Sequence, residues 1–176
     1  MKYKVTKKQY NSQMCLICGL ENRLGMKASF YEVETGEVVA LFTPREEHQS
    51  YPGRLHGGMI SALLDETIER AIMVTEPDIW GVTVELTLKY RKPVPLNQPL
   101  KAIGRVTKNS RKIFEGTAEI VLDDGTVAAT ASGKFFKMPL SEITDAAAVA
   151  QQWQITLDEA EPETITLGKN KNNGTQ

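Results

Sequence analysis

Residues 51–70, YPGRLHGGMISALLDETIER, decide the fold, because a glycine-containing loop passes there into an amphipathic helix. From Gly57 to about Val74, apolar side chains recur at spacings of three and four residues, which is the period of an α-helix. These apolar residues are Ile60, Leu63, Leu64, Ile68, Ala71 and Ile72. The pattern predicts one long helix that packs this stripe against a core and carries Asp65 on another face.

Two strands are predicted before this helix and four after it, in an antiparallel arrangement. In the long strand 81–94, regular alternation places Val82, Val84 and Leu86 on one face and Thr83 on the other. The predicted strands cover residues 26–33, 37–43, 81–94, 100–109, 112–122 and 126–138. This order of elements predicts an α+β fold in which a helix packs on one antiparallel sheet.

The composition is that of one globular domain, with 176 residues of which 41% are hydrophobic and 24% charged. A formal net charge of -1 gives no general attraction to nucleic acid or to an anionic membrane surface, so neither is a predicted partner. The start of the chain lacks the apolar region of a secretion signal, and no apolar run approaches the roughly 20 residues of a membrane span. We therefore predict a soluble, cytoplasmic protein whose Cys15 and Cys18 are reduced.

Four parts are predicted along the chain. An N-terminal segment with a Cys-x-x-Cys-Gly motif covers residues 1–26, and the main domain covers residues 27–140. A C-terminal helix that begins at a Ser141 cap is predicted over residues 141–154. Residues 155–176 lack the periodicity of a core element, so a disordered tail is predicted there.

The start of the helix, His56-Gly57-Gly58, is a candidate binding site. Backbone N–H groups in the first turn have no partners within the helix and carry the positive end of its dipole. A carbonyl oxygen could therefore approach Gly57 and Gly58 and be polarised as in an oxyanion hole. Alternatively, the glycine pair only permits a tight turn. For His56, a positioning role as a hydrogen-bonding cap is favoured over a role as general base.

Asp65 lies seven residues after Gly58, on nearly the same face of the helix and about 10.5 Å further along its axis. That distance is long for two groups that would contact one substrate atom. Glu69 shares the face of Asp65, and two like charges there tend to raise one pKa. Glu66 faces Arg70 in an ordinary surface ion pair. The pattern alone leaves Asp65 open between a solvated charge and a functional base.

The Cys15-x-x-Cys18 motif needs a second pair of cysteines, or histidines at suitable spacing, to form a convincing zinc site. The remaining candidates are His48 and His56, and both lie at least 30 residues beyond Cys18. No metal site is therefore predicted, and His48 is expected to be exposed to solvent.

Three cations near predicted strand ends, Arg91, Arg111 and Lys112, are candidate substrate-binding residues. If the substrate carries a nucleotide with phosphates, guanidinium and ammonium groups would bind them. Alternatively, the three are ordinary solvated charges.

The motif LHGGMISALLDE, followed 18 residues after Asp65 by Thr83, resembles the PaaI-like branch of the hotdog-fold acyl-CoA thioesterases. The segment CLICGLENRLGMKASFY resembles the opening of many of these proteins, and the resemblance covers residues 15–138. It implies a curved antiparallel sheet of about six strands around one central helix. It also implies a homodimer, or a homotetramer built as a dimer of dimers, with active sites at the subunit interface and no cofactor.

The resemblance implies a role for each residue of the central helix and the strand after it. The Gly57 N–H would polarise the thioester carbonyl of an acyl-CoA substrate. Asp65 of the partner subunit would act as general base on water or as nucleophile, and Thr83 would hold the water or the acid.

Other residues near the helix start are expected to support these roles. His56 and Gly58 belong to the same His-Gly-Gly motif, with Gly58 as a substrate-binding position. Many relatives place an amide side chain about six residues before the histidine. Ser50 occupies that position here, with Gln49 beside it, and either side chain could position water.

Two other readings remain open. A hotdog protein can bind acyl-CoA without turnover, although the presence of Asp65 argues against it. A hotdog dehydratase or hydratase is suggested by HQSYPG, but the acid expected about five residues after Pro-Gly would fall at Gly58. The sequence leaves the acyl group undefined within the small and aromatic thioesters that the family favours.

Overall fold

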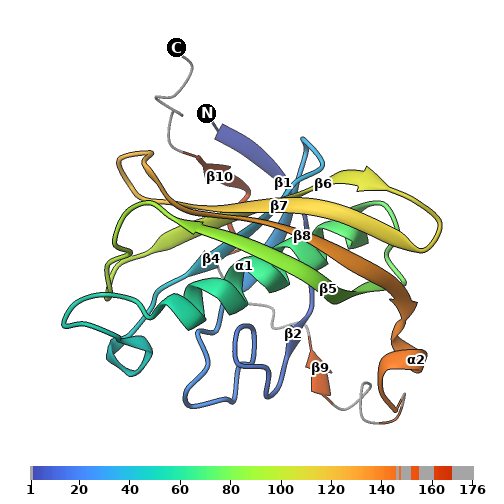
Figure 1. Ribbon diagram of the computed structural model, residues 1–176, viewed down its shortest axis with the longest axis horizontal. Helices are drawn as coiled ribbons and strands as arrows, with labels where there is room; N and C mark the ends of the chain where they lie inside the picture. Colours follow the sequence, from blue (N-terminus) through green and yellow to red (C-terminus); the bar gives the residue numbers. More distant parts are fainter. Residues whose placement is uncertain (1, 146, 148–151, 155–160, 168–176) are drawn as a thin grey trace.

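The computed structural model describes residues 2–145, 147, 152–154 and 161–167, and it shows one large antiparallel sheet curved around a single long helix (Figure 1). The helix is α1 (Gly57–Ala71), and a 3-10 turn at Ile72–Val74 extends it. This arrangement confirms the α+β fold predicted from the sequence. Among the described residues, no helix has the length and apolar character that crossing a membrane requires.

The sheet has eight strands in the order β10-β1-β3-β4-β6-β7-β8-β5. They are β1 (Lys2–Lys8), β3 (Ser29–Val33), β4 (Val38–Phe42), β5 (Ile79–Tyr90), β6 (Leu100–Asn109), β7 (Ile113–Val121), β8 (Val127–Pro139) and β10 (Thr164–Thr166). A separate pair joins β2 (Asn11–Ser12) to β9 (Trp153–Gln154). A 3-10 turn at Glu46–His48 and the short helix α2 (Leu140–Ile143) complete the described elements.

The six predicted strands all occur, and β1 and β10 add two more at one edge of the sheet. Ile165 and Leu167 are buried in a second apolar cluster with Tyr31 and Val39. Residues 164–167 are therefore packed against the domain, which contradicts the predicted disordered tail at that point. The remainder of the predicted tail, residues 155–160 and 168–176, lies outside the described residues.

The predicted C-terminal helix over residues 141–154 is wrong as one continuous element. Helix α2 follows Pro139 and ends at Ile143, where Thr144 takes an extended conformation. Trp153 and Gln154 form a strand instead of the end of a helix. Most of the predicted helix between these points, residues 146 and 148–151, lies outside the described residues.

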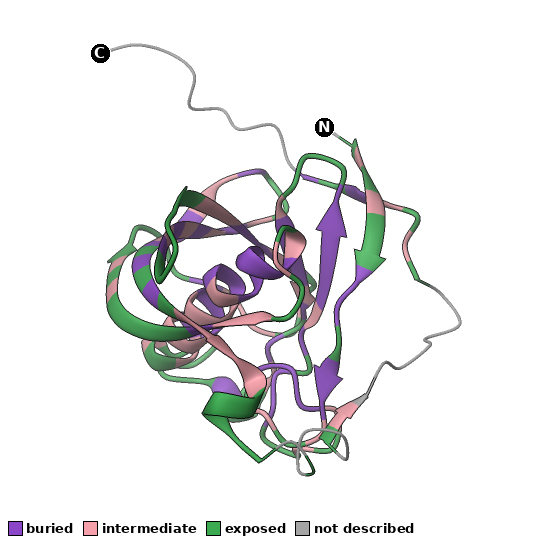
Figure 2. Cartoon of the chain, turned by 90° about the vertical axis from the view of Figure 1, so that its right-hand side faces the viewer, coloured by how far each residue is buried: buried purple, intermediate pink, exposed green. Residues whose placement is uncertain are grey.

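Helix α1 is covered on one side by the sheet and on the other by the N-terminal segment, and Figure 2 shows the buried residues concentrated in the helix and the strands around it. Its apolar stripe, including Leu63, Leu64 and Ile68, is fully buried. The Asn11 amide donates to the carbonyl oxygens of Cys18 at 2.7 Å and Ala28 at 2.9 Å. These bonds hold the loop that carries the two cysteines against the domain.

The sheet approaches α1 closely at Gly104 of β6 and Gly116 of β7. A Cβ atom at Gly104 would overlap the Thr67 carbonyl oxygen, and one at Gly116 would overlap the Ile68 side chain. Both positions therefore need glycine because of the close approach of helix and sheet.

Replacing Gly104 with alanine is expected to lower the free energy of unfolding by about 1–3 kcal/mol, because the backbone of α1 must shift to admit the methyl group. Urea denaturation measures the change. Gly57→Ala is the matched control, since a Cβ atom there would lie 3.6 Å from the Tyr90 ring, an ordinary contact. Equal stability of the two variants would contradict the close approach.

Candidate active site

The start of α1 is fixed by His56, which is the N-cap residue with φ -64° and ψ 137°. Its Nδ1 atom accepts a hydrogen bond from the Gly58 N–H at 2.8 Å, and its own backbone N–H donates to the His48 carbonyl at 2.9 Å. Among the described residues, the Gly57 N–H has no acceptor. The cap therefore occupies one donor of the first turn and leaves the Gly57 donor available at the positive end of the helix.

Tyr90, at the end of β5, also contacts the helix start. Its hydroxyl donates to the Gly57 carbonyl oxygen at 3.0 Å. The sequence patterns did not single out Tyr90 as a residue near the helix start.

A β-bulge in β5 determines which side chains face α1. Thr83 pairs with Phe135 of β8, but Glu85 already pairs with Lys134, so Val84 is an extra residue on β5. Val84 is 62% exposed, which contradicts the predicted regular alternation of the strand. The bulge turns Thr83 toward the helix while Leu86, further along, remains packed against the core.

Asp65 and Thr83 form the polar contact between the middle of α1 and β5. The Thr83 hydroxyl donates to both carboxylate oxygens of Asp65, at 3.0 and 3.1 Å. Burial raises the pKa of Asp65 above its usual value, the Thr83 hydrogen bond opposes this shift, and the charge of Glu66 adds to it. Asp65 is therefore a half-buried, oriented carboxylate rather than a solvated charge.

Glu69 lies one turn beyond Asp65 on the same helix. Its burial raises its pKa to about 8, with smaller contributions from Glu66 and Asp65 and an opposing one from Arg70. The carboxyl group is thus mostly protonated at neutral pH. Desolvation, rather than the like charge of Asp65 alone, is the main cause.

A cavity of about 420 Å³ lies beside Thr83. Its lining includes Cys15, Glu66, Glu69, Trp80, Thr83 and Trp153. The two tryptophan rings are 4.8 Å apart and tilted by 59°. The cavity thus combines an apolar wall with carboxyl groups from the central helix.

The family model described as the thioesterase superfamily matches residues 52–129, which include α1 and its His-Gly-Gly start. The chain is similar to the thioesterase superfamily over this segment. Human acyl-coenzyme A thioesterase 13 is 28% identical over 87 residues, which are 49% of this chain and 62% of that protein. Rat acyl-coenzyme A thioesterase THEM4 is 31% identical over 121 residues, 68% of this chain and 51% of that protein. The chain therefore spans about half to three fifths of these relatives.

Solved structures confirm the hotdog fold and the resemblance to the PaaI-like branch of this superfamily. A thioesterase superfamily protein superposes with a TM-score of 0.65 at 27% identity, covering 70% of this chain and 63% of that one. A variant of the phenylacetic acid degradation protein PaaI of Thermus thermophilus gives 0.52 at 25% identity, covering 58% and 86%. The PaaI protein of Escherichia coli gives 0.58 at 18% identity, covering 64% and 80%, and shows the fold alone.

The loop before α1 places Gln49 and Ser50 near the helix start. The Gln49 side-chain oxygen accepts a hydrogen bond from the Gly53 N–H at 2.7 Å, and Gly53 has a positive φ of 72°. Gln49 thus stabilises its own loop. Among the described residues, the Ser50 hydroxyl has no hydrogen-bond partner and is exposed. Of the two candidates for positioning water, Ser50 has the free side chain.

The prediction that His48 is exposed is wrong. Its side chain is buried, with 2% exposure. Nδ1 accepts from the Arg45 N–H at 3.0 Å, and Nε2 lies 2.9 Å from the Leu24 carbonyl oxygen, which requires the hydrogen on Nε2. The imidazole therefore joins two loops and is not free for chemistry.

The three candidate cations are exposed, but the fold separates them within one chain. Arg91 follows β5 and lines a groove on the face of the sheet opposite α1, together with Lys89 and Arg105. Arg111 and Lys112 lie in the turn between β6 and β7, where the Lys112 carbonyl accepts from the Lys137 N–H at 2.8 Å. The two groups lie at opposite ends of β8, next to Ala128 and Lys137, which are about 30 Å apart along the strand.

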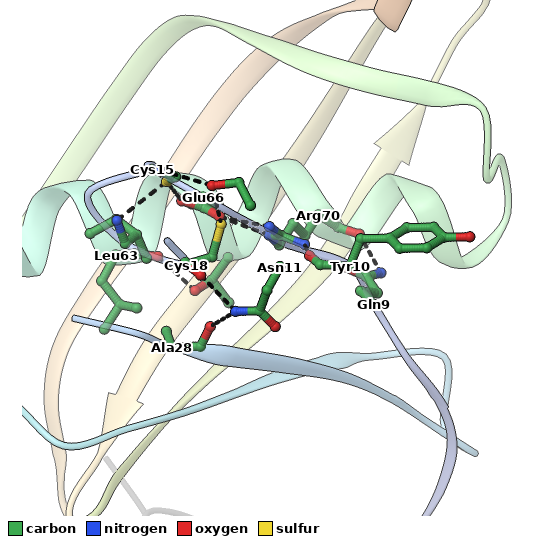
Figure 3. Close-up of polar contacts among 12 residues, drawn as sticks. Gln9, Tyr10, Asn11, Cys15, Cys18, Ala28, Leu63, Glu66 and Arg70 are labelled. Carbon is green, nitrogen blue, oxygen red and sulfur yellow. Dashed lines mark hydrogen bonds and ion pairs between the residues drawn. The ribbon is translucent and has the colours of Figure 1, made fainter. Parts of the chain in front are cut away.

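The prediction of an ordinary surface pair between Glu66 and Arg70 is also wrong. Arg70 is 1% exposed and packs over the Phe30 ring at 4.2 Å. Its Nε and Nη2 atoms lie 2.9 Å from Glu66 Oε1, and its Nη1 donates to the Tyr10 carbonyl at 2.9 Å (Figure 3). The sequence missed this burial because the covering residues come from the distant N-terminal segment.

Proposed function

We propose that this chain is an acyl-CoA thioesterase that hydrolyses a small or aromatic acyl-CoA to the free acid and coenzyme A. The proposal rests on the Asp65 carboxylate, which is half-buried on the central helix and accepts a hydrogen bond from the Thr83 hydroxyl of β5. The match of residues 52–129 to the thioesterase superfamily model supports it. The relatives named acyl-coenzyme A thioesterase support the reaction class, and those named for phenylacetic acid degradation support a small or aromatic acyl group.

Asp65 would act on the thioester carbonyl by one of two routes. As a general base it takes a proton from the attacking water, and the carbonyl intermediate then expels the coenzyme A thiolate. As a nucleophile it forms an acyl-enzyme anhydride with loss of the thiolate, and water then hydrolyses the anhydride. In both routes the Gly57 N–H stabilises the negative charge on the carbonyl oxygen.

The proposed site is shared between two subunits. Gly57 and Asp65 are eight residues apart on one helix, about 12 Å along its axis, so one carbonyl group cannot meet both within a chain. Strand β5 is the edge of the sheet next to Asp65, and its Val82 and Val84 are exposed. A long edge strand with exposed apolar residues supports pairing with a second copy. We therefore propose a homodimer, or a homotetramer assembled from two dimers.

Supporting roles follow from the same arrangement. His56 positions the Gly57 donor by capping the helix, and Gly58 permits close approach although its own N–H is occupied. Arg91, from one end of the sheet, and Arg111 with Lys112, from the other, are proposed to bind the phosphates of coenzyme A. Their separation within one chain means that a single substrate would meet them from different subunits.

The reaction is tested by measuring free thiol release from acetyl-, hexanoyl-, benzoyl- and phenylacetyl-CoA. We expect turnover with at least one of them and a loss of about 100- to 10,000-fold in the Asp65→Asn variant. Ligand-induced thermal stabilisation without any thiol release would identify a binding protein instead. Addition of water to an enoyl-CoA without thiol release would identify a hydratase.

Replacing Thr83 with valine is expected to lower kcat by about 10- to 100-fold, because a hydrogen bond to a charged group contributes about 1.5–3 kcal/mol. The valine keeps the shape of threonine but leaves the Asp65 carboxylate without its donor. Thr83→Ser, which restores the hydroxyl, should return most of the activity. If serine and valine are equally impaired, the hydrogen bond is not what Thr83 contributes.

A further inference from the structure

A cluster of three potential metal ligands lies on the opposite side of α1 from the sheet (Figure 3). Cys15 and Cys18 come from the loop after β2, and Glu66 comes from α1. The two sulfur atoms and a Glu66 carboxylate oxygen all lie within 4.8 Å of one another. The Cys15 thiol donates to Glu66 Oε2 at 3.1 Å.

We propose that Cys15, Cys18 and Glu66 bind one soft divalent cation, for which Zn²⁺ is the best match. Two thiolates select Zn²⁺ over Mg²⁺ and Ca²⁺, and a carboxylate oxygen is a common additional ligand. Around a tetrahedral zinc, with bonds of about 2.0–2.3 Å, ligand atoms lie about 3.3–3.8 Å apart. The Cys15–Glu66 contact of 3.1 Å and the upper limit of 4.8 Å for all three separations bracket this range.

The surroundings of the cluster already orient its ligands. Arg70 engages Glu66 Oε1 and so leaves Oε2 directed at Cys15. The Ile17 N–H donates to Cys15 Sγ at 3.3 Å, and Cys18 Sγ lies 3.6 Å from the Ser12 hydroxyl. Outer contacts of this kind fix the orientation of metal ligands and tune the bound ion.

The charges balance when a divalent cation is present. Two thiolates and one carboxylate carry three negative charges, which one divalent cation and the Arg70 guanidinium neutralise. Cys18 and Arg70 are fully buried, so a neutral cluster avoids the large cost of uncompensated charge away from water. The thiols release their protons as they bind.

The site would have three protein ligands and one open position. His48 is bonded to Arg45 and Leu24, and His56 caps α1, so within the described chain neither histidine is free to complete the site. Cys15 and Glu66 also line the cavity beside Thr83, from which water could occupy the fourth position. Sequence reasoning excluded a metal because it considered histidine and cysteine only, whereas Glu66 is 48 residues beyond Cys18.

The proposal is tested by metal binding to the full chain, independently of thioester hydrolysis. The reduced, metal-free protein is titrated with Co²⁺ and with Zn²⁺ in competition with a chromophoric chelator. We expect one ion per chain, and a thiolate-to-cobalt charge-transfer band in the near ultraviolet. Zn²⁺ should also protect both thiols from a disulfide reagent until EDTA is added. Absence of binding, or cobalt binding without the thiolate band, would overturn the site.

Variants identify the ligands. Removing a residue that only contacts a metal ligand typically weakens metal binding by about 10- to 100-fold. Cys15→Ser and Glu66→Gln remove a ligand itself, so each should weaken Zn²⁺ binding by more than that. Glu115→Gln is the matched control, because Glu115 of β7 pairs with Lys108 of β6 and is outside the cluster. Wild-type affinity in Glu66→Gln would overturn the three-ligand site. The wild-type cobalt spectrum keeps the proposal testable if a variant fails to fold.

Discussion

Replacing Asp65 with asparagine is expected to lower kcat/KM for the best acyl-CoA substrate by about 100- to 10,000-fold, the contribution typical of a positioned acid or base. Asparagine can neither accept a proton from water nor attack the thioester. Its side-chain oxygen still accepts the hydrogen bond from Thr83, so the contact between α1 and β5 should survive. Thiol release measures the loss of activity, and the thermal unfolding midpoint checks that the fold is retained.

Asp78→Asn is the matched control for this variant. Asp78 is exposed in the loop before β5, so the substitution makes the same change in charge without touching α1. It should keep wild-type activity. Full activity in Asp65→Asn would show that the reaction, if present, uses another acid.

Replacing Gly57 with proline is expected to lower kcat by about 100- to 1,000-fold, the effect of losing one oxyanion donor. Proline lacks the backbone N–H but is tolerated at the first position of a helix. His56, the residue before it, already has φ -64° and ψ 137°, an extended conformation that suits the residue preceding a proline. The substitution therefore removes the proposed donor and leaves the helix start in place.

Gly57→Ala separates the loss of the N–H from the loss of glycine itself. Alanine keeps the donor, and its Cβ atom would make only ordinary contacts with Tyr90. Gly57→Ala should therefore remain far more active than Gly57→Pro in thiol release. Similar activity of the two variants would argue against a role for this N–H.

The main elements of the fold were predictable because their periodicity is local. The spacing of Ile60, Leu63 and Leu64 predicts α1, and six of the eight strands of the large sheet are also predicted from the sequence. Strand β1 was not predicted because four of its seven residues are lysines, and only Tyr3 and Val5 alternate with them as apolar residues. Strand β10 has only three residues, too few for a clear pattern, and the apolar cluster that it covers is formed by distant strands.

The candidate site was predictable only in part. The motif spacing placed Gly57, Asp65 and Thr83 together as candidates, and the structure adds the direct bond from Thr83 to Asp65. The bulge at Val84 could not be read from the strand, because the alternation of residue types continues through it and the shift is set by pairing with β8. The burial of Arg70 likewise depends on contacts with segments far away in the sequence.

A mixed dimer gives the most direct test of a site shared between two subunits. Asp65→Asn and Gly57→Pro chains are co-expressed with different affinity tags, and dimers that carry both tags are purified. In a two-fold dimer with shared sites, one site of the mixed dimer regains both wild-type residues, so we expect about half the wild-type kcat per dimer. Both homodimers should be nearly inactive. A mixed dimer as inactive as the two homodimers would contradict the shared site.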